Sequence, residues 1–381
     1  MTTLGILGGG QLARMLALAA APLGVRCRVL EPSPLAVAGH VAELVVGDYA
    51  DPAALQTFAK GLDVVTFEFE NVPAQATDWL QQHVPVAPPP RALAVGQDRI
   101  AEKTLFRHLG MLVPEFRAAS TCAELHAAVA AVGAPCVVKT RRLGYDGKGQ
   151  VRLHSGPDLP ARIDAAFAEL DDPRHGGLIV EAFVPFTREL SVIAVRGAAG
   201  AVAVYPLVEN HHEGGILRRS HAPAPGLAPG LQRDAVQFAT ALLEHLDYRG
   251  VLAVELFECQ GRLLANEMAP RVHNSGHWTI EGSVCSQFEN HVRAVAGLPL
   301  GSTAMAQPAA TMVNLIGELP SRRALLALPG VHVHAYGKAG RAGRKVGHAT
   351  VVGSERAAVD AAAAAVLALG PGSAAEWGFV G

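Results

Sequence analysis

Strand and helix patterns alternate through the first 86 residues of this 381-residue chain. The segments with strand character are LGILGG, RCRVLEP, AELVVGD and DVVTFEFE. Between them lie two helical segments: QLARMLALAAAPLG, closed by Gly24, and DPAALQTFAKG, with Asp51 as N-cap and Pro52 at the first position. Helices that connect successive strands bring those strands parallel to one another. The pattern therefore predicts an α/β domain built on a parallel sheet.

The loop after the first strand is rich in glycine. In GILGGGQLARML (5–16), Gly8, Gly10 and Ala13 match the pattern G-x-G-x-x-A, and Glu31 follows the second strand. Such a loop presents free N–H groups and a helix N-terminus to an anion, and the acid can hold a ribose hydroxyl. The motif alone leaves three interpretations open: a nicotinamide dinucleotide site, a site for another phosphate, or a tight turn.

The pattern changes after residue 86. Pro88, Pro89 and Pro90 make a stiff connection and mark a domain edge. Helices are expected in QDRIAEKTLFRHLG and TCAELHAAVAAVG, and antiparallel strands from Val137 onward, including one hairpin that turns at Gly197–Gly200. The last 70 residues contain short strands and an Ala-rich helix. We therefore expect a mixed α+β arrangement after the first domain.

Composition narrows the classes of function. The length predicts two or three domains, and a net charge of -2 gives no basic excess for a nucleic-acid partner. No apolar run is long enough to span a membrane, and no leader segment follows Met1. Five scattered cysteines argue against a disulfide framework and a cysteine metal site and fit a reducing cytoplasm. The 16 histidines form no H-x-x-x-H helix pair near a Glu, which disfavours a zinc hydrolase.

A second glycine-rich loop lies in VVKTRRLGYDGKGQ (137–150). Its glycines allow the backbone to fold over phosphates, and Lys139 and Lys148 can neutralise them. The segment does not match G-x-x-x-x-G-K-[ST], so it is not a P-loop. The alternative is an exposed basic hairpin turn.

A pair of acids follows in VELFECQGRLLANEMAPR (254–271). If the hairpin turn is centred on Gly261, Glu255 and Glu267 face each other, with Asn266 beside them. Two carboxylates in this arrangement suit Mg²⁺, which binds through one or two carboxylates and substrate phosphates. The alternative is a pair of surface acids on a hairpin.

The segment APRVHNSGHWT (269–279) is dense in polar side chains. A loop with so many polar groups rarely serves packing alone. Arg271 could fork onto a carboxylate or a phosphate. This segment therefore predicts a functional loop directly after the acidic hairpin, and the alternative is a structural role alone.

These three segments, in this order, resemble the ATP-grasp superfamily. With GILGGGQLARM, TFEFENVP, GYDGKGQ, NEMAPRVHNSGHWT and YGKAGRAGRKVGH, the chain resembles the 5-(carboxyamino)imidazole ribonucleotide synthase family from residue 4 to about residue 350. The resemblance implies an ATP-grasp architecture in three parts. These are an N-terminal Rossmann-like preATP-grasp domain for the acceptor substrate (1–98), a central lid domain (99–186), and a C-terminal mixed α+β domain with the metal site and a small terminal subdomain (187–381).

The resemblance also implies which residues bind ATP and metal. The ATP contacts would be Arg99 and Lys139 at the phosphates, the lid Gly144, Tyr145, Asp146, Gly147, Lys148, Gly149 and Gln150, the adenine hinge Glu181, Ala182, Phe183 and Val184 through its backbone, Glu189 at the ribose, and His212 and Asn266 near the phosphates. Glu255 and Glu267 would hold Mg²⁺, with Mn²⁺ as a possible substitute. Two histidines stand together at 211–212, and the second matches the family better.

The implied acceptor site would take aminoimidazole ribonucleotide and bicarbonate. Its residues would be Gly10, Gln11 and Leu12 at the first helix, Glu70, Tyr145, Asp146, Arg271, His273, Asn274 and Ser275 around the imidazole and the new carboxylate, and Lys338, Arg344 and Lys345 at the ribonucleotide phosphate. Lys139, Asp146, Arg271 and His273 would be the catalytic residues.

The implied reaction is an ATP-dependent ligation. Bicarbonate attacks the γ-phosphate of ATP, and the exocyclic amine of the ribonucleotide takes the carboxyl group from carboxyphosphate or from CO₂ released in the closed site. The family is usually homodimeric and cytoplasmic. The alternatives are another ATP-grasp ligase, such as a formate-dependent glycinamide ribonucleotide transformylase, a dinucleotide-dependent oxidoreductase, and a catalytically inactive nucleotide sensor.

Overall fold

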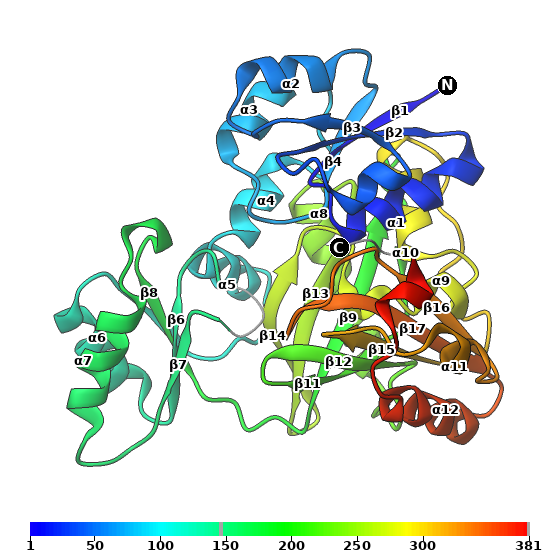
Figure 1. Cartoon of the computed structure of the whole chain (residues 1–381). Coiled ribbons are helices and arrows are strands. Elements are labelled where there is room, and N and C mark those ends of the chain that lie inside the picture. Colours follow the sequence, from blue (N-terminus) through cyan, green and yellow to red (C-terminus); the bar gives the residue numbers. More distant parts are fainter. Residues whose placement is uncertain (145–147, 379–381) are drawn as a thin grey trace.

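The computed structural model describes residues 1–144 and 148–378 and contains three β-sheets (Figure 1). One sheet lies in the N-terminal part, one in the central part, and the largest in the C-terminal part. In Figure 1 the central part projects to the left of the other two. The predicted combination of a parallel N-terminal sheet with mixed helix and strand content elsewhere is confirmed.

The N-terminal sheet is parallel and has the strand order β3–β2–β1–β4. Its strands are β1 (Thr3–Leu7), β2 (Arg26–Glu31), β3 (Glu43–Val46) and β4 (Val64–Phe67), and its helices are α1 (Gln11–Ala20), α2 (Pro52–Ala59), α3 (Ala74–Gln81) and α4 (Pro90–Gly96). The Asp51 carboxylate accepts a hydrogen bond of 2.9 Å from the Ala53 N–H, which confirms the predicted N-cap of α2.

The central sheet is antiparallel and has the order β5–β8–β6–β7. Its elements are β5 (Phe116–Ala119), α6 (Cys122–Val132), β6 (Cys136–Thr140), β7 (Gln150–Leu153), α7 (Leu159–Leu170) and β8 (Leu178–Ala182). Helices α6 and α7 pack against each other and against the sheet through a core that includes Leu125, Val129, Ile163 and Val180. The expected strand pair around the second glycine-rich loop is β6 and β7.

The C-terminal sheet contains the path β14–β13–β9–β11–β12–β15–β17–β16, with β10 paired to β9. The strands are β9 (Arg188–Arg196), β10 (Val202–Val204), β11 (Val208–Glu213), β12 (Ile216–Ala222), β13 (Gly250–Cys259), β14 (Arg262–Ala269), β15 (Ala309–Ile316), β16 (Val331–Ala335) and β17 (Lys345–Gly353). The helices are α8 (Leu231–His245), α9 (Thr279–Gly282), α10 (Gln287–Val295), α11 (Arg322–Leu326) and α12 (Arg356–Ala368).

Helix α5 (Arg99–His108) connects the central part to this large sheet. It packs against β14, and its Phe106 belongs to the same buried cluster as Leu190 and Leu252 of the large sheet. The sequence is amphipathic, so the opposite stripe of the helix carries charged side chains. The first helix after the expected boundary at residue 98 therefore packs on the C-terminal core, while the domain boundaries themselves stay predictions.

A buried histidine bridges the N-terminal and C-terminal sheets. The His291 Nδ1 accepts a hydrogen bond of 3.1 Å from the Val251 N–H on β13, so its Nε2 carries the proton and donates to Thr66 Oγ1 on β4 at 2.8 Å. Burial lowers the pKa of His291 to about 3. In the folded protein the ring is therefore neutral.

Two observations bear on the composition argument. No helix in the described ranges is both long and apolar enough to cross a bilayer. All five cysteines lie within those ranges and are free thiols, as expected from their scatter along the sequence. The expectation of no disulfide framework is thus confirmed for these thiols.

The neutral His291 predicts a pH dependence of stability. Its pKa of about 3 in the folded chain lies below the unfolded value of about 6.5, so its stabilising contribution is complete above pH 6.5 and is lost as the pH falls toward 3. The loss amounts to about 1.4 kcal/mol per pH unit. We expect His291→Gln to flatten the fall in the free energy of unfolding between pH 6 and pH 4, measured by urea denaturation.

The control is His83→Gln, because His83 is exposed. This variant should keep the slope of the parent protein. An equal slope in His291→Gln and in the parent would contradict the assignment, whatever the absolute stability of the variant.

Candidate active site

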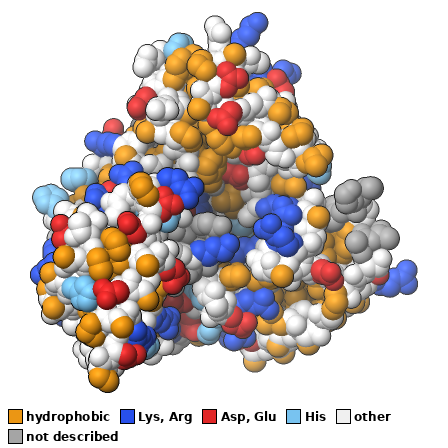
Figure 2. Space-filling view, turned by 60° about the vertical axis from the view of Figure 1, so that its left-hand side comes forward, with side chains coloured by type: hydrophobic (Ala, Val, Ile, Leu, Met, Phe, Trp, Pro, Cys, Tyr) orange, Lys and Arg blue, Asp and Glu red, His pale blue; other side chains and the backbone are white. Residues whose placement is uncertain are grey.

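A cleft of about 1320 Å³ is lined by residues of all three parts of the chain. The N-terminal part contributes Gln11, Leu12 and Glu70, and the other two parts contribute most of the remaining lining. Figure 2 shows a hollow near the middle of this face, with Lys and Arg side chains on both of its sides. A cleft with a polar, largely basic lining suits anionic ligands such as nucleotides.

The two predicted metal carboxylates face each other in the register of the β13–β14 hairpin, where Glu255 pairs with Glu267. The predicted turn centre was wrong by half a residue. The turn is Gln260–Gly261, both with positive φ, and Cys259 pairs with Arg262. A β-bulge next to Glu255 shifts the register by one residue, so the two acids still pair. The extra residue in the bulge is Asn266.

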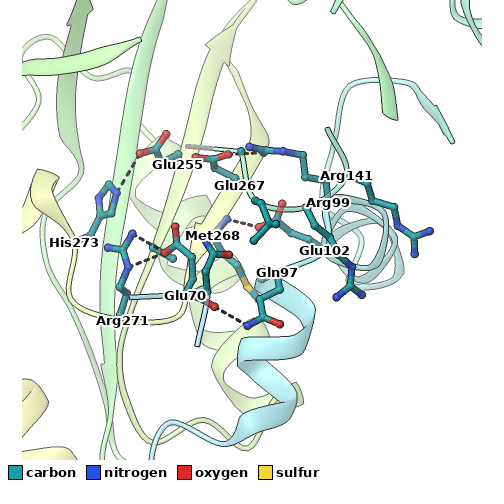
Figure 3. A pocket seen from close by; sticks show the side chains of 16 residues that line it. Glu70, Gln97, Arg99, Glu102, Arg141, Glu255, Glu267, Met268, Arg271 and His273 are labelled. Carbon is teal, nitrogen blue, oxygen red and sulfur yellow. Dashed lines mark hydrogen bonds and ion pairs between the residues drawn. The ribbon is translucent and has the colours of Figure 1, made fainter. Parts of the chain in front are cut away.

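The charges around this pair shift the pKa values of the two carboxylates in opposite directions (Figure 3). The Arg99 guanidinium lies 2.6 Å from Glu267 Oε2. Burial alone would raise the pKa of Glu267, but Arg99 holds it well below its usual range. Burial and the negative charge of Glu267 raise the pKa of Glu255. Glu267 is therefore ionised, whereas a nearby cation would stabilise the ionised form of Glu255.

An orphaned oxygen supports a metal ion at this place. Asn266 Oδ1 is buried beside Glu267 and has no hydrogen-bond partner among the residues that the structure describes. Buried polar atoms are almost always paired, so an unpaired acceptor next to two carboxylates is the arrangement that a hard cation completes. The donor set is all oxygen, which fits Mg²⁺ or Mn²⁺.

Three cations converge on the acids of the ATP side. Glu181 Oε2 lies 2.9 Å from the Lys139 Nζ and 3.4 Å from the Lys103 Nζ. Burial would raise the pKa of Glu181, but the two lysines lower it to about 2. Lys103 is fully buried and also donates to the Asn266 carbonyl at 2.9 Å. Lys139 and Arg99 both line the cleft, and their predicted contacts with ATP phosphates stay predictions.

Sequence reasoning missed Lys103 and its neighbour Glu102, whose carboxylate accepts a hydrogen bond of 2.6 Å from the Met268 N–H. Both residues are buried. The signal was present: Glu102, Lys103 and Phe106 follow Arg99 at helical spacings that place them near one face. Charged residues on the apolar stripe of a helix indicate a buried ionic site.

The expected adenine hinge lines the cleft, but two of its N–H groups already have partners. The Ala182 N–H donates to the Glu115 carbonyl at 2.8 Å, and the Phe183 N–H donates to the Pro135 carbonyl at 3.2 Å. This differs from the expectation that these amides read the base edge, because β8 uses them to anchor its own end. Val184 is the hinge residue whose amide takes no part in those bonds.

Other expected ATP contacts lie in the same cleft. Glu189 and His212 are hydrogen-bonded to each other, and the His212 pKa is raised because Glu189 outweighs the effect of burial. The lid residues Gly144, Lys148, Gly149 and Gln150 also line the cleft. Tyr145, Asp146 and Gly147 lie outside the described residues, so their predicted roles stay predictions.

The first glycine-rich loop is filled by carboxylates of the chain itself. The Gly10 N–H donates to one oxygen of Glu68, and the Ala13 N–H donates to the other at 2.8 Å. The Gly9 N–H donates to Glu31 at 3.0 Å. A Cβ at Gly10 would lie 2.5 Å from Glu68 Oε1, so glycine is required there to admit this side chain.

This finding excludes the dinucleotide interpretation of the loop. The helix N-terminus that would hold a pyrophosphate already holds the buried Glu68 carboxylate, and the acid that would hold a ribose, Glu31, accepts bonds from Gly9 and Tyr49. The expectation that Gly10 contacts the acceptor substrate is corrected for the same reason. Gln11 and Leu12, by contrast, do line the cleft.

The acceptor side of the cleft is rich in Arg and Lys. Arg271 forms an ion pair with Glu70, with the Arg271 Nη2 2.6 Å from the Glu70 Oε2. Lys338, Arg344 and Lys345 also line the cleft, and Lys338 contacts the Gln11 side chain. The structure therefore brings together residues that the sequence places more than 300 positions apart.

A hydrogen-bonded row of buried polar side chains, called here the polar row, lies behind residues 269–279. The Ser220 hydroxyl donates to Asn210 Oδ1 at 2.7 Å, and the Asn210 amide donates to Ser191 Oγ at 3.0 Å. The Ser191 hydroxyl in turn donates to Ser275 Oγ at 2.8 Å. Ser275 is fully buried, and its hydroxyl belongs to this polar row and does not line the cleft. Its predicted contact with the substrate is therefore corrected.

The polar row ends at the His273 ring and determines which ring nitrogen carries the proton. The Ser275 N–H donates to His273 Nδ1 at 3.3 Å, and the Ser275 Oγ lies 2.9 Å from the same nitrogen. Nδ1 is therefore the acceptor, and the ring carries its proton on Nε2, 3.4 Å from Glu255 Oε1. Burial and the nearby Arg271 lower the pKa of His273 well below its usual value. His273 thus presents a neutral N–H donor to the cleft.

Asn274, the residue between His273 and Ser275, is tied to β15 of the large sheet. Its side-chain amide and that of Asn314 on β15 exchange two hydrogen bonds, of 3.0 and 2.8 Å. Asn274 also lines the cleft. The loop that carries His273 is thus held to the large sheet at both β9 and β15.

Comparisons with known families match three successive regions of the chain. Residues 1–97 match the ribonucleotide synthetase preATP-grasp domain, residues 104–288 match the ATP-grasp domain, and residues 310–362 match the phosphoribosylaminoimidazole carboxylase C-terminal domain. The acidic hairpin, the partly buried Lys139 and the segment 269–279 all lie within the ATP-grasp match.

Individual relatives that are similar over nearly the whole chain include named synthases. The N5-carboxyaminoimidazole ribonucleotide synthase of Pseudomonas aeruginosa is 50% identical over 366 residues, which cover 96% of this chain and 99% of that protein. The crystal structure of N5-carboxyaminoimidazole ribonucleotide synthetase from Thermus thermophilus matches with a TM-score of 0.91 and 51% identity, covering 97% of this chain and 99% of that one. A structure of the Aspergillus clavatus synthase in complex with ADP and 5-aminoimidazole ribonucleotide matches with a TM-score of 0.88 and 30% identity, covering 96% and 97%. This chain belongs to the N5-carboxyaminoimidazole ribonucleotide synthase family of ATP-grasp enzymes.

Proposed function

We propose that this protein is a ligase that uses ATP to carboxylate the exocyclic amine of 5-aminoimidazole ribonucleotide with bicarbonate. The observation that carries the proposal is a single cleft with two ends. The Glu255–Glu267 pair and the Arg99–Lys139 cations form one end, and Arg271, His273 and the basic segment 338–345 form the other. The products are 5-(carboxyamino)imidazole ribonucleotide, ADP and phosphate, as in purine biosynthesis.

The first step is phosphoryl transfer. A bicarbonate oxygen attacks the γ-phosphorus of ATP, a P–O bond forms, and ADP leaves, giving carboxyphosphate. Arg99, Lys139 and the buried Lys103 stabilise the negative charge on the transferring group, and they are held in place beforehand by Glu267 and Glu181. Preorganised charge of this kind lowers the barrier because it does not have to reorient during the reaction.

Glu255, Glu267 and the Asn266 side-chain oxygen would hold the divalent cation, Mg²⁺ or Mn²⁺. When bound, the cation supplies charge neutralisation at the ATP phosphates. A bound cation would also keep Glu255 ionised, because its positive charge offsets the burial and the repulsion from Glu267 that raise the pKa of this acid.

The second step is carboxyl transfer. The exocyclic amine attacks the carbonyl carbon of carboxyphosphate, or CO₂ released from it, a C–N bond forms, phosphate leaves and the amine loses a proton. Arg271 and the Nε2–H of His273 suit the carboxylate that is being transferred, since both are donors in the cleft. Lys338, Arg344 and Lys345 suit the ribonucleotide phosphate.

A formate-dependent glycinamide ribonucleotide transformylase is the nearest alternative activity. The deciding measurement is phosphate release from ATP with bicarbonate, with and without 5-aminoimidazole ribonucleotide. Release that depends on both substrates supports the proposal. Release that requires formate and glycinamide ribonucleotide instead would overturn it.

The homodimer and the cytoplasmic location stay predictions from family resemblance. Size-exclusion chromatography with light scattering tests the first, with about twice the mass of the 39.7 kDa chain as the expected result. A mass equal to one chain at micromolar concentration would contradict it.

Removal of one metal carboxylate should abolish turnover. We expect Glu267→Gln to lower kcat by at least about 100-fold, because the cation site and the partner of Arg99 are weakened together, at a cost of several kcal/mol in the transition state. The fold should stay intact, as measured by circular dichroism. Glu244→Gln on the exposed face of α8 is the control. Full activity of Glu267→Gln at ordinary Mg²⁺ concentrations would contradict the assignment of Glu267 as a metal ligand.

Two substitutions separate the roles on the acceptor side. Arg271→Ala should lower kcat for carboxylation by about 100-fold with the KM for ATP unchanged, because its fork acts on the carboxylate in the transition state. Lys345→Ala should mainly raise the KM for the ribonucleotide, since a phosphate contact is equal in ground and transition states. Steady-state kinetics with each substrate varied separately tests both. Loss of ATP binding alone in Arg271→Ala would refute the pocket assignment.

The polar row predicts a positioning role for Ser191. We expect Ser191→Ala to reduce kcat roughly fivefold without changing the KM for ATP, because one hydrogen bond of about 1 kcal/mol no longer orients Ser275 and His273. Ser283→Ala is the matched control. Ser283 is also a buried serine, but its hydroxyl donates to the Thr279 carbonyl at 2.7 Å and is not part of the polar row. Equal effects of the two variants on kcat would indicate a purely structural role.

A further inference from the structure

Three different metal-binding side chains converge on the outer face of the central part, away from the cleft. Cys122 and His126 lie one turn apart on α6, and Asp164 lies on the adjacent helix α7. Asp164 Oδ1 is 2.8 Å from His126 Nε2 and 3.2 Å from Cys122 Sγ, and the three ligand atoms all lie within 4.8 Å of one another. None of the three is among the described residues that line the cleft.

We propose that Cys122, His126 and Asp164 form a binding site for a divalent transition-metal ion of the Zn²⁺ type. One thiolate, one imidazole and one carboxylate are the ligand types that Zn²⁺ takes, in a tetrahedron whose fourth position is open to water. The same set is a poor one for Mg²⁺, which prefers oxygen ligands in an octahedron. The site is therefore chemically distinct from the all-oxygen site of Glu255, Glu267 and Asn266.

The separations of Asp164 Oδ1 from the other two ligand atoms are close to those of a tetrahedral site. With metal–ligand bonds of roughly 2.0–2.3 Å, neighbouring ligand atoms lie roughly 3.3–3.6 Å apart. The separations of 2.8 and 3.2 Å must therefore widen by a few tenths of an ångström. Side-chain rotation can provide this, because His126 and Asp164 are 38% and 62% exposed.

The backbone positions of the three ligands are fixed by the core. Leu125 lies between Cys122 and His126 and is fully buried, and Ile163 next to Asp164 is buried in the same cluster. The Thr121 side chain caps the N-terminus of α6 by accepting a hydrogen bond from the Glu124 N–H. Two packed helices thus hold the ligands in place before any metal arrives, which reduces the entropic cost of binding.

Metal binding replaces two hydrogen bonds with three coordinate bonds. The Cys122 thiol, which now donates to Asp164, loses its proton to solvent, so one proton leaves for each metal ion bound. His126 coordinates through Nε2, the nitrogen that now donates to Asp164; its proton moves through solvent to Nδ1, so the neutral ring keeps one proton. The bound ion would link α6 to α7 and brace the central part without entering the cleft.

The experiment uses the full-length, reduced protein and Co²⁺ as a spectroscopic probe for Zn²⁺. With Mg²⁺ in excess to occupy the all-oxygen site, we expect one thiolate-bound Co²⁺ per chain, seen as a near-ultraviolet band from thiolate-to-metal charge transfer, and displacement of that band by Zn²⁺. Cys122→Ser should remove the band. His126→Ala and Asp164→Asn should weaken binding by about tenfold or more.

Cys259→Ser is the matched control, since this partly exposed cysteine lies on β13, and its thiol contacts the Pro185 carbonyl. It should keep both the band and the affinity. A band that survives Cys122→Ser, or that disappears in Cys259→Ser, would overturn the site. No thiolate band at millimolar Co²⁺ would mean that the three side chains form hydrogen bonds only.

A second measurement tests the consequence for the fold. Hydrogen exchange in α6 and α7 should slow when Zn²⁺ is added to the parent protein, and should not change in Cys122→Ser. Phosphate release from ATP should be equal in the parent and in this variant, because the residue takes no part in the proposed chemistry. Zn²⁺-induced protection in Cys122→Ser equal to that of the parent would contradict the proposal.

Discussion

The buried ion pairs between α5, the central sheet and the acidic hairpin are the interaction on which the rest of the site depends. Lys103 is fully buried, so it must be compensated, and Glu181 together with the Asn266 carbonyl provides that compensation. Removing either partner of such a pair leaves an isolated buried charge, at a cost of about 3–5 kcal/mol. The central sheet and the large sheet are therefore locked to one helix by electrostatics as well as by packing.

The same network explains why the cleft can hold a polyanion. Arg99 pairs with Glu267, and Lys103 and Lys139 share Glu181, so these two carboxylates offset two of the three positive charges. A nucleotide with its cation brings its own balance of charge. Positive groups that are already oriented need no reorganisation when a phosphoryl group begins to carry extra negative charge.

The sequence predicted the fold class and the acidic pair, because both depend on local patterns. Alternating strands and helices indicated the parallel sheet, and hairpin symmetry placed Glu255 opposite Glu267. The pairing was right although the turn centre was not, since the bulge at Asn266 compensated for the half-residue error. A bulge of this kind has no reliable sequence signature, because it depends on what the inserted residue contacts in three dimensions.

The parts that could not be predicted depend on distant partners. The glycine-rich loop was ambiguous because the residue that fills it, Glu68, lies 58 positions from Gly10. Ser275 belongs to the polar row, which crosses three strands, and nothing in its own segment shows that it is turned inward. Cys122 and His126 have a helical spacing that was visible, whereas Asp164 joins them only through the packing of α6 on α7.

Glu68 gives the N-terminal domain an intramolecular ligand for a loop that in other proteins binds dissolved anions. A tethered carboxylate acts at an effective concentration that a free metabolite has difficulty matching. Nucleotides that circulate in a cell at high concentration, such as nicotinamide cofactors, therefore find the N–H groups of this loop already bonded to a carboxyl group of the chain. The domain keeps the rigid strand–loop–helix geometry of a phosphate-binding fold and is at the same time insulated from the ligands for which that geometry is usually made.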